Sequence, residues 1–265
     1  MCGLVGIASK TSQSDRSWLP VARDALIHRG PDDAGLWWSE DGRVGLAHRR
    51  LSIFDLSPLG HQPMVFAESK LSIVFNGEIY NFIELRRELE QLGHSFRSQS
   101  DTEVLLAAYA EWGTGFLERL NGMFAFALFD ASEQRVILAR DRAGEKPLFY
   151  RQNGNTLIFA SELKALLAYP ALTGRIDPEA LDCYLSMGYV PGDRCILEGF
   201  CKLPPAHAMT FNLNQGNAKI WRYWDLPKLN HSVSDTCEEL LLDELETSNG
   251  IGVIEQFRFR FVDHL

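Results

Sequence analysis

Short hydrophobic stretches recur along the first 160 residues, some alternating with polar positions and some apolar throughout. Both patterns are typical of β-strands, the first with one buried face and the second with two. The segments that we expect to be strands are Leu4–Ala8, Val44–His48, Leu71–Phe75, Met123–Phe129, Val136–Ala139, Leu148–Tyr150 and Thr156–Ala160. Polar connections of hairpin length, Asp130–Arg135 and Gln152–Asn155, join two pairs of these strands, and the second contains an Asn-Gly turn signal. The pattern therefore predicts antiparallel sheet.

Other segments place apolar residues three and four positions apart, which is typical of helices with one buried face. The expected helices are Trp18–Ile27, Glu84–Leu92, Thr102–Trp112, Pro178–Met187 and the acidic segment Ser234–Glu246. Asp177 is a suitable N-cap for the fourth helix, with Pro178 at its first position. Helices set apart from hairpin-linked strands favour a layered α+β fold, with helices outside two antiparallel sheets.

The last third of the chain changes character. Residues 176–226 are rich in proline, glycine and aromatic residues, and we expect an irregular segment around the core. Beyond the acidic helix, residues 247–265 alternate phenylalanine with arginine and have no visible relation to what precedes them.

Composition excludes several classes of protein. With 265 residues, 46% hydrophobic and 23% charged, the chain is neither disordered nor fibrous. Its net charge of −9 argues against a nucleic-acid or anionic-membrane partner. No apolar run approaches the roughly 20 residues of a membrane span, and no signal peptide is apparent, so we expect a cytoplasmic protein. Five cysteines without a C-x-x-C pair and seven histidines without helical ligand spacing predict no disulfide framework and no metal site.

Cys2 is the first candidate for chemistry. Removal of Met1 would leave a cysteine with its own α-amine, whose ordinary pKa of about 8 suits it to accept the thiol proton. A cysteine at position two also occurs by chance, and on this residue alone chance is the better explanation.

Three further segments are ambiguous when each is taken alone. Asn76 and Gly77 form a turn signal, but an Asn amide and the next backbone N–H can also stabilise an oxyanion. Arg50 at a strand end is either a solvated charge or a clamp for a carboxylate. Asp101, or Ser100 before it, is most simply the N-cap of a helix.

Taken together and in order, these segments resemble the class II glutamine amidotransferases, specifically the glutamine-hydrolysing asparagine synthetases. The resemblance rests on Met1–Gly6, His28–Asp32, Leu46–Ile53, Asn76–Asn81, Ser100–Glu103, Gly122–Phe126, Ala139–Arg142, Lys146–Tyr150 and Ala160–Leu166. It covers about residues 2–246 and implies a four-layer αββα N-terminal-nucleophile hydrolase fold with two antiparallel sheets.

The resemblance also implies a role for each site residue. Cys2 would attack the side-chain amide of glutamine, and Asn76 with Gly77 would form the oxyanion hole. Arg50 would hold the substrate α-carboxylate, while Glu78 and Asp101 would hold its α-ammonium. The backbone of Leu51, Ser52, Ile53 and Phe54 would line the same pocket.

The same resemblance implies three regions: a class II amidotransferase domain over 2–205, a connector and first helix of a truncated synthetase domain over 206–246, and an unrelated tail over 247–265. The full-length family uses ATP and Mg²⁺ at an S-G-G-x-D-S loop, which this sequence lacks, so no cofactor is expected here. The implied partners are glutamine, a separate synthetase domain or subunit, and a second copy in a homodimer. Two alternatives stay open: an ammonia donor for a sugar or peptide precursor, and an inactive truncated remnant.

Overall fold

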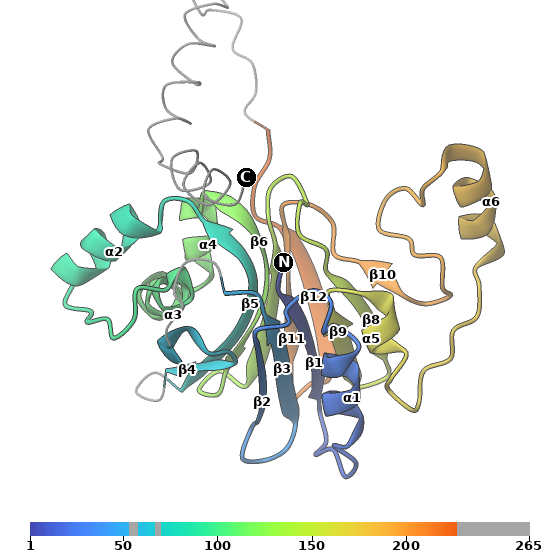
Figure 1. Cartoon of the computed structure of the whole chain (residues 1–265), viewed down its shortest axis with the longest axis horizontal. Helices are drawn as coiled ribbons and strands as arrows, with labels where there is room; N and C mark the ends of the chain where they lie inside the picture. The colour runs from blue at the N-terminus through green and yellow to red at the C-terminus, as the bar shows by residue number, and fades with distance from the viewer. Residues whose placement is uncertain (53–57, 67–69, 227–265) are drawn as a thin grey trace, which may run out of the picture.

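Two six-stranded antiparallel sheets form the centre of the computed structural model, which describes residues 1–52, 58–66 and 70–226 (Figure 1). The first sheet has the order β10-β8-β9-β1-β3-β2, formed by Cys201–Lys202, Phe149–Asn153, Thr156–Ala160, Gly3–Ser9, Val44–Arg50 and Asp33–Trp38. The second has the order β12-β11-β7-β6-β5-β4, formed by Asn217–Arg222, His207–Asn212, Arg135–Arg140, Gly122–Asp130, Leu71–Ile79 and Met64–Phe66. The expected α+β class with two antiparallel sheets is confirmed.

Helices cover the outer face of each sheet. The described helices are α1 (Trp18–Asp24), α2 (Phe82–Gln91), α3 (Asp101–Trp112), α4 (Phe116–Arg119), α5 (Leu163–Leu166) and α6 (Pro178–Met187), with 3₁₀ turns at Pro58–Gly60 and Gly113–Gly115. One apolar cluster joins α1 and α5 to β1, β3 and β9, and another joins α2, α3 and α4 to β5, β6 and β7. A third cluster fills the space between the sheets. These three clusters define the four αββα layers.

Strand β6 shows why the pattern predicts this layering. Phe124, Phe126 and Leu128 face the helices, whereas Ala125, Ala127 and Phe129 face the other sheet. Because successive side chains of a strand point to opposite faces, a strand that is apolar throughout must be covered on both. The expected hairpins between β6 and β7 and between β8 and β9 are both present.

The structure corrects the sequence interpretation in the last third of the described chain. The segment expected to be irregular contains the β11–β12 hairpin, and β11 pairs with β7 in the second sheet. Strand β12 has no clear alternation because it is an edge strand, mostly exposed along its length. The predicted helix Ser234–Glu246 and the tail 247–265 lie outside the described residues.

Two glycines allow β5 and β6 to pack closely beside the site. Gly77 pairs with Phe124, and Gly122 pairs with Ile79. A β-carbon at Gly77 would lie 2.2 Å from the Met123 carbonyl oxygen, and one at Gly122 would lie 2.2 Å from the Glu78 carbonyl oxygen. Only glycine therefore fits at either position without displacing backbone.

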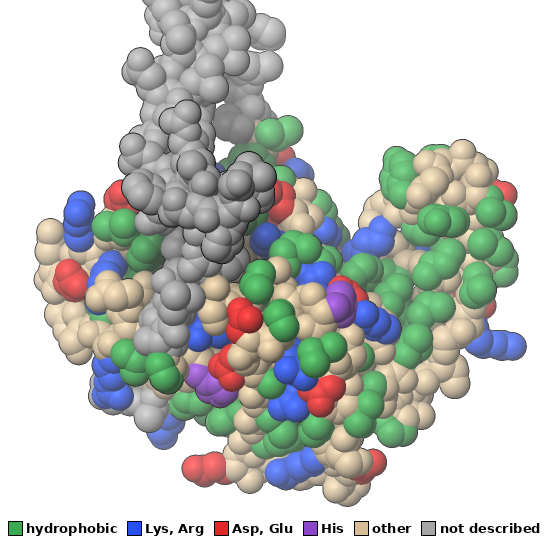
Figure 2. Space-filling view, in the orientation of Figure 1, with side chains coloured by type: hydrophobic (Ala, Val, Ile, Leu, Met, Phe, Trp, Pro, Cys, Tyr) green, Lys and Arg blue, Asp and Glu red, His purple; other side chains and the backbone are tan. Residues whose placement is uncertain are grey.

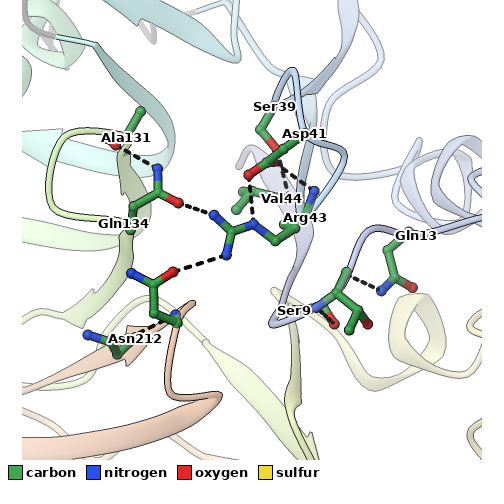
Figure 3. Close-up of polar contacts among 11 residues, drawn as sticks. Ser9, Gln13, Ser39, Asp41, Arg43, Val44, Ala131, Gln134 and Asn212 are labelled. Carbon is green, nitrogen blue, oxygen red and sulfur yellow. Dashed lines mark hydrogen bonds and ion pairs between the residues drawn. The ribbon is translucent and has the colours of Figure 1, made fainter.

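A polar cluster around Arg43 joins the turns at the far end of the two sheets (Figure 3). Arg43 precedes β3 and forms an ion pair with Asp41, at 2.6 Å. Its guanidinium also donates to Gln134, in the turn between β6 and β7, and to Asn214, in the turn between β11 and β12. One side chain thus connects the first sheet to two turns of the second.

Helix α6 projects from the two-sheet body, and apolar side chains gather on its surface (Figures 1 and 2). It matches the predicted helix at both ends: Asp177 accepts from the N–H groups of Glu179 and Ala180, and Gly188 ends the helix in the left-handed conformation.

Candidate active site

A cavity of about 270 Å³ opens where β1 begins and β3 ends. The N-terminus of α3, the second half of β5 and the loop before β8 complete its wall. The lining residues are Met1, Cys2, Arg50, Leu51, Gly60, Gln62, Phe75, Asn76, Gly77, Glu78, Ser100, Asp101, Thr102, Met123 and Lys146.

The Cys2 thiol lies against the backbone of Leu51. Its Sγ accepts from the Leu51 N–H at 3.4 Å and lies 3.6 Å from the Leu51 carbonyl oxygen, to which it donates. Burial raises the pKa of this thiol, while the Leu51 contact and the N-terminal amine oppose the rise. That amine belongs to Met1, and burial lowers its pKa, as do the charges of Arg29 and Lys146.

Arg29 fixes the backbone of Cys2. Its Nε donates to the Cys2 carbonyl oxygen at 2.8 Å, and its Nη1 forms an ion pair with Glu162 at 3.0 Å. His28 and Lys164 also contact Glu162, at 3.0 and 3.3 Å. The charged cluster therefore holds the backbone of the residue that bears the thiol.

Asn76 is an amide group without a protein partner at its nitrogen. The residue is 1% exposed, and no described atom accepts a hydrogen bond from its Nδ2. A buried polar group is normally paired, so an unpaired donor that lines a cavity indicates a place for a ligand acceptor. Gly77 follows it on the same wall.

Two carboxyl groups lie on the same wall. Burial first, and then the neighbouring charge of Asp101, raises the pKa of Glu78 to about 7. Burial raises the pKa of Asp101 to about 6, although the N–H of Ile79 donates to it at 3.1 Å. Glu78 Oε2 has no partner among the described residues. A buried pair of like charges is well suited to receive a cation.

Gln62 connects two walls of the cavity. Its Oε1 accepts from the Phe75 N–H at 2.6 Å, and its Nε2 donates to Thr102 Oγ1 at 3.3 Å. Gly60 leaves room for the Arg50 guanidinium, since a β-carbon there would lie 2.1 Å from Arg50 Nη2.

Buried His48 joins β3 to β5 directly behind Asn76. Its Nε2 lies 2.9 Å from the Phe75 carbonyl oxygen, and burial lowers its pKa to about 4. The neutral ring therefore donates to that carbonyl and holds the strand that bears Asn76.

Seven of the site residues named from the sequence line this one cavity: Cys2, Arg50, Leu51, Asn76, Gly77, Glu78 and Asp101. Ser52 does not line it, and its N–H donates to Asp32 at 2.7 Å. Ile53 and Phe54 lie outside the described residues.

Sequence reasoning assigned no catalytic or binding role to several lining residues: Gly60, Gln62, Phe75, Ser100, Thr102, Met123 and Lys146. Ser100 was expected only as a helix N-cap, and it is the N-cap of α3. Four of these lining residues lie inside segments that carry the family resemblance, so the sequence motifs could have indicated them: Ser100, Thr102, Met123 and Lys146. Gln62 lies in a loop with no pattern that could have indicated it.

Among the described residues, no group of three or more His, Cys, Asp or Glu side chains could hold a metal ion. In the same residues, no helix is both long and apolar enough to cross a bilayer.

The two-sheet fold and the cavity at Cys2 are those expected of a glutamine amidotransferase domain. Residues 1–224 match the family described as glutamine amidotransferase domain, and the chain belongs to that family.

Among known proteins, the chain is 39% identical over 240 residues to asparagine synthetase [glutamine-hydrolyzing] 3 of Bacillus subtilis, covering 88% of this chain and 38% of that protein. It is 34% identical over 243 residues to amidase chry2 of Gibberella zeae, covering 91% of this chain and 35% of that protein. The chain thus spans less than half the length of these relatives.

A solved structure shares the fold. Glutamine phosphoribosylpyrophosphate amidotransferase from B. subtilis superposes with a TM-score of 0.61 at 21% identity, over 84% of this chain and 49% of that one.

Proposed function

We propose that this chain hydrolyses glutamine to glutamate and ammonia, with Cys2 as the nucleophile. One observation carries the proposal: a single cavity brings together a thiol, an unpaired amide donor, a guanidinium and two carboxyl groups. Glutamine offers an amide carbonyl, an α-carboxylate and an α-ammonium, so each group of the cavity has a counterpart on the substrate.

Each charged group of the substrate would bind a cavity residue of opposite charge. Arg50 would bind the α-carboxylate, since a guanidinium matches a carboxylate with two parallel hydrogen bonds. Glu78 and Asp101 would bind the α-ammonium, and the backbone of residues 51–54 would line the pocket. Bound ammonium would also stabilise the ionised form of both carboxyl groups.

The reaction proceeds through a thioester. The α-amine of Cys2, exposed once Met1 is removed, takes the thiol proton as sulfur bonds to the amide carbon. Asn76 Nδ2 and the Gly77 N–H donate to the resulting oxyanion. The C–N bond then breaks, the amine returns its proton to the leaving nitrogen, and ammonia departs. Water attacks the thioester, restoring the thiol and releasing glutamate.

The test is glutamate release by the purified chain without ATP, after mass spectrometry has shown the loss of Met1. We expect release by the native chain and at least a thousandfold loss in Cys2→Ala, because no described neighbour offers a substitute nucleophile of comparable reactivity. Cys183→Ala is the matched control, since this cysteine lies on α6, outside the cavity lining. Glutamate release that survives in Cys2→Ala contradicts the proposal.

We further propose that the ammonia serves the ATP-dependent amidation of aspartate, which the names of the asparagine synthetase relatives support. ATP and Mg²⁺ would act in a separate synthetase domain or subunit. In this proposal, neither ATP nor Mg²⁺ contacts a described residue of this chain. The amidotransferase domain, expected over residues 2–205, continues in this proposal through β11 and β12, because both strands belong to its second sheet. The residues after β12, up to 246, lead toward the synthetase, and 247–265 are a separate tail. The unpaired Cys2, Cys183, Cys195 and Cys201 support a cytoplasmic location.

A second candidate is ammonia donation to another acceptor, since no described residue identifies the acceptor. The two candidates separate when [¹⁵N-amide]glutamine is supplied to the native host and to the same host carrying Cys2→Ala in this chain. Label that Cys2→Ala removes from asparagine supports the first candidate, whereas label that it removes from another amide supports the second.

A further inference from the structure

The loop between β7 and β8 surrounds a buried carboxylate. Asp141 is 1% exposed and accepts four backbone N–H groups, those of Phe124, Ala143, Glu145 and Lys146, at 2.9 to 3.1 Å. One acceptor therefore fixes the shape of the whole loop and attaches it to β6.

Arg140 holds the same loop through its carbonyl groups. Its guanidinium donates to the carbonyl oxygens of Lys146 at 2.7 Å, Leu203 at 2.8 Å and Gly144 at 2.5 Å. The N–H and the carbonyl of Lys146 are thus both engaged, by Asp141 and Arg140 respectively. This double attachment sets the direction in which the Lys146 side chain leaves the loop.

Lys146 lines the cavity that contains Cys2, and the residue is only 8% exposed. Within the described part of the chain, its ammonium makes no ion pair or side-chain hydrogen bond, and Nζ is not among the buried atoms without a partner, so it stays open to solvent. The ammonium therefore lines the same cavity as the carboxyl groups of Glu78 and Asp101 without being paired with either.

We propose that Lys146 is a positioning residue for glutamine hydrolysis, acting through Glu78 rather than by touching the substrate. The proposal rests on the function proposed above. Lys146 and Glu78 line the same cavity, and the ammonium favours the ionised carboxylate of Glu78, which must bind the substrate ammonium.

The electrostatics of Glu78 support this role. The Lys146 charge lowers the pKa of Glu78, against the larger effects of burial and the Asp101 charge. Removing the Lys146 charge therefore raises the pKa of Glu78, and its ionised form then appears only at higher pH.

The first experiment measures the pKa of Glu78 directly, by ¹³C NMR of the carboxyl carbon in the substrate-free protein, with Glu78→Gln to assign the signal. Lys146→Met is compared with the native chain, with Lys146→Arg, and with Lys219→Met, which removes a charge from the exposed strand β12. We expect a higher Glu78 midpoint in Lys146→Met alone. An unchanged midpoint overturns the proposal, whether or not the chain hydrolyses glutamine.

The second experiment follows kcat/KM for glutamine hydrolysis from pH 5.5 to pH 9.5 in the same variants. Below the midpoint, a tenfold higher proton affinity lowers the ionised fraction about tenfold. Lys146→Met should therefore lose about tenfold at pH 6, mainly through KM, and approach the native value near pH 9. An equal loss at every pH indicates a purely structural role and overturns the proposal.

The two proposals fail separately. A raised Glu78 midpoint in a chain without Cys2-dependent hydrolysis contradicts the proposed function and leaves the electrostatic effect of Lys146 established.

Discussion

At the scale of single residues, the cavity contains groups that are costly to the fold. Asn76 leaves a buried donor unpaired, and Glu78 leaves a buried oxygen unpaired. Each such group costs about 1–3 kcal/mol in a folded protein. Free energy lost in this way is regained only when a ligand supplies the missing partners, which is a common property of binding sites.

Glu78 provides a test of that cost. Its pKa is raised from 4.5 to about 7, so between these values the folded chain binds more protons than the unfolded chain. Stability therefore falls as the pH rises from about 4.5 to 7, since folding disfavours the ionised form. We expect Glu78→Gln to stabilise the protein at pH 8 by on the order of 2 kcal/mol, and to weaken glutamine binding.

Urea unfolding of Glu78→Gln and the native chain at pH 5 and pH 8 checks this prediction. Glu40→Gln is the control, because Glu40 is exposed. A variant less stable than the native chain at pH 8 would show that the carboxylate stabilises the fold.

At the scale of elements, periodicity predicted the structure where one element buries a broad face. The seven predicted strands and four of the five predicted helices are present, within a few residues at their ends, and the fifth helix lies outside the described residues. Most of the missed elements have weak patterns for physical reasons. Strands β2 and β12 lie at sheet edges with mixed exposure, β4 and β10 have three and two residues, and α4 and α5 are single turns. Strand β11 was missed as well, although it lies inside the second sheet, because it follows a segment rich in proline, glycine and aromatic residues.

The site was predictable for a different reason. Periodicity places Cys2, Arg50 and Asn76 near the ends of strands, but only the resemblance to a known family indicates that they meet. Gln62 and His48 contact the site through hydrogen bonds across the fold, to Phe75 in both cases. Contacts between residues far apart in sequence leave no local pattern, so a single sequence could not reveal them.

The loop around Asp141 yields a prediction at this scale. Asp141→Ala would leave four backbone N–H groups without their acceptor, three of them in the loop. We expect a loss of about 3–5 kcal/mol of stability, measured by urea unfolding. Asp182→Ala on the exposed face of α6 should change stability by less than about 0.5 kcal/mol. A loss below about 1 kcal/mol in Asp141→Ala would show that the loop keeps its shape without the carboxylate.

At the scale of the whole molecule, the candidate site and the Arg43 cluster lie at opposite ends of the two sheets. The cavity lies where β3 ends at Arg50, whereas the Arg43 cluster lies where β3 begins. At about 3.3 Å per residue, the two arginines are roughly 23 Å apart. The candidate site thus lies at one end, and contacts between the sheets close the other.

Arg43→Met tests whether the Arg43 cluster contributes to stability alone and not to hydrolysis. Loss of the contacts to Asp41, Gln134 and Asn214 should lower the free energy of unfolding by about 1 kcal/mol and leave kcat/KM for glutamine unchanged. Arg87→Met on the exposed face of α2 is the matched control for lost charge. Hydrolysis that falls in Arg43→Met beyond the change seen in Arg87→Met would show that the two ends are coupled.

The position of β1 has a practical consequence for anyone who prepares this protein. Gly3–Ser9 is buried at every residue and lies between β3 and β9, so whatever precedes Cys2 leaves the sheet beside the cavity, where Met1 already forms part of the lining. If Cys2 is the nucleophile, as proposed, an affinity tag fused ahead of it would keep its α-amine in a peptide bond, and we expect folded material with no turnover. The tag should therefore be placed at the C-terminus. The expression host should have enough methionine aminopeptidase to remove Met1 from all of the protein that it makes. The activity per milligram would then measure the fraction of molecules that have lost Met1.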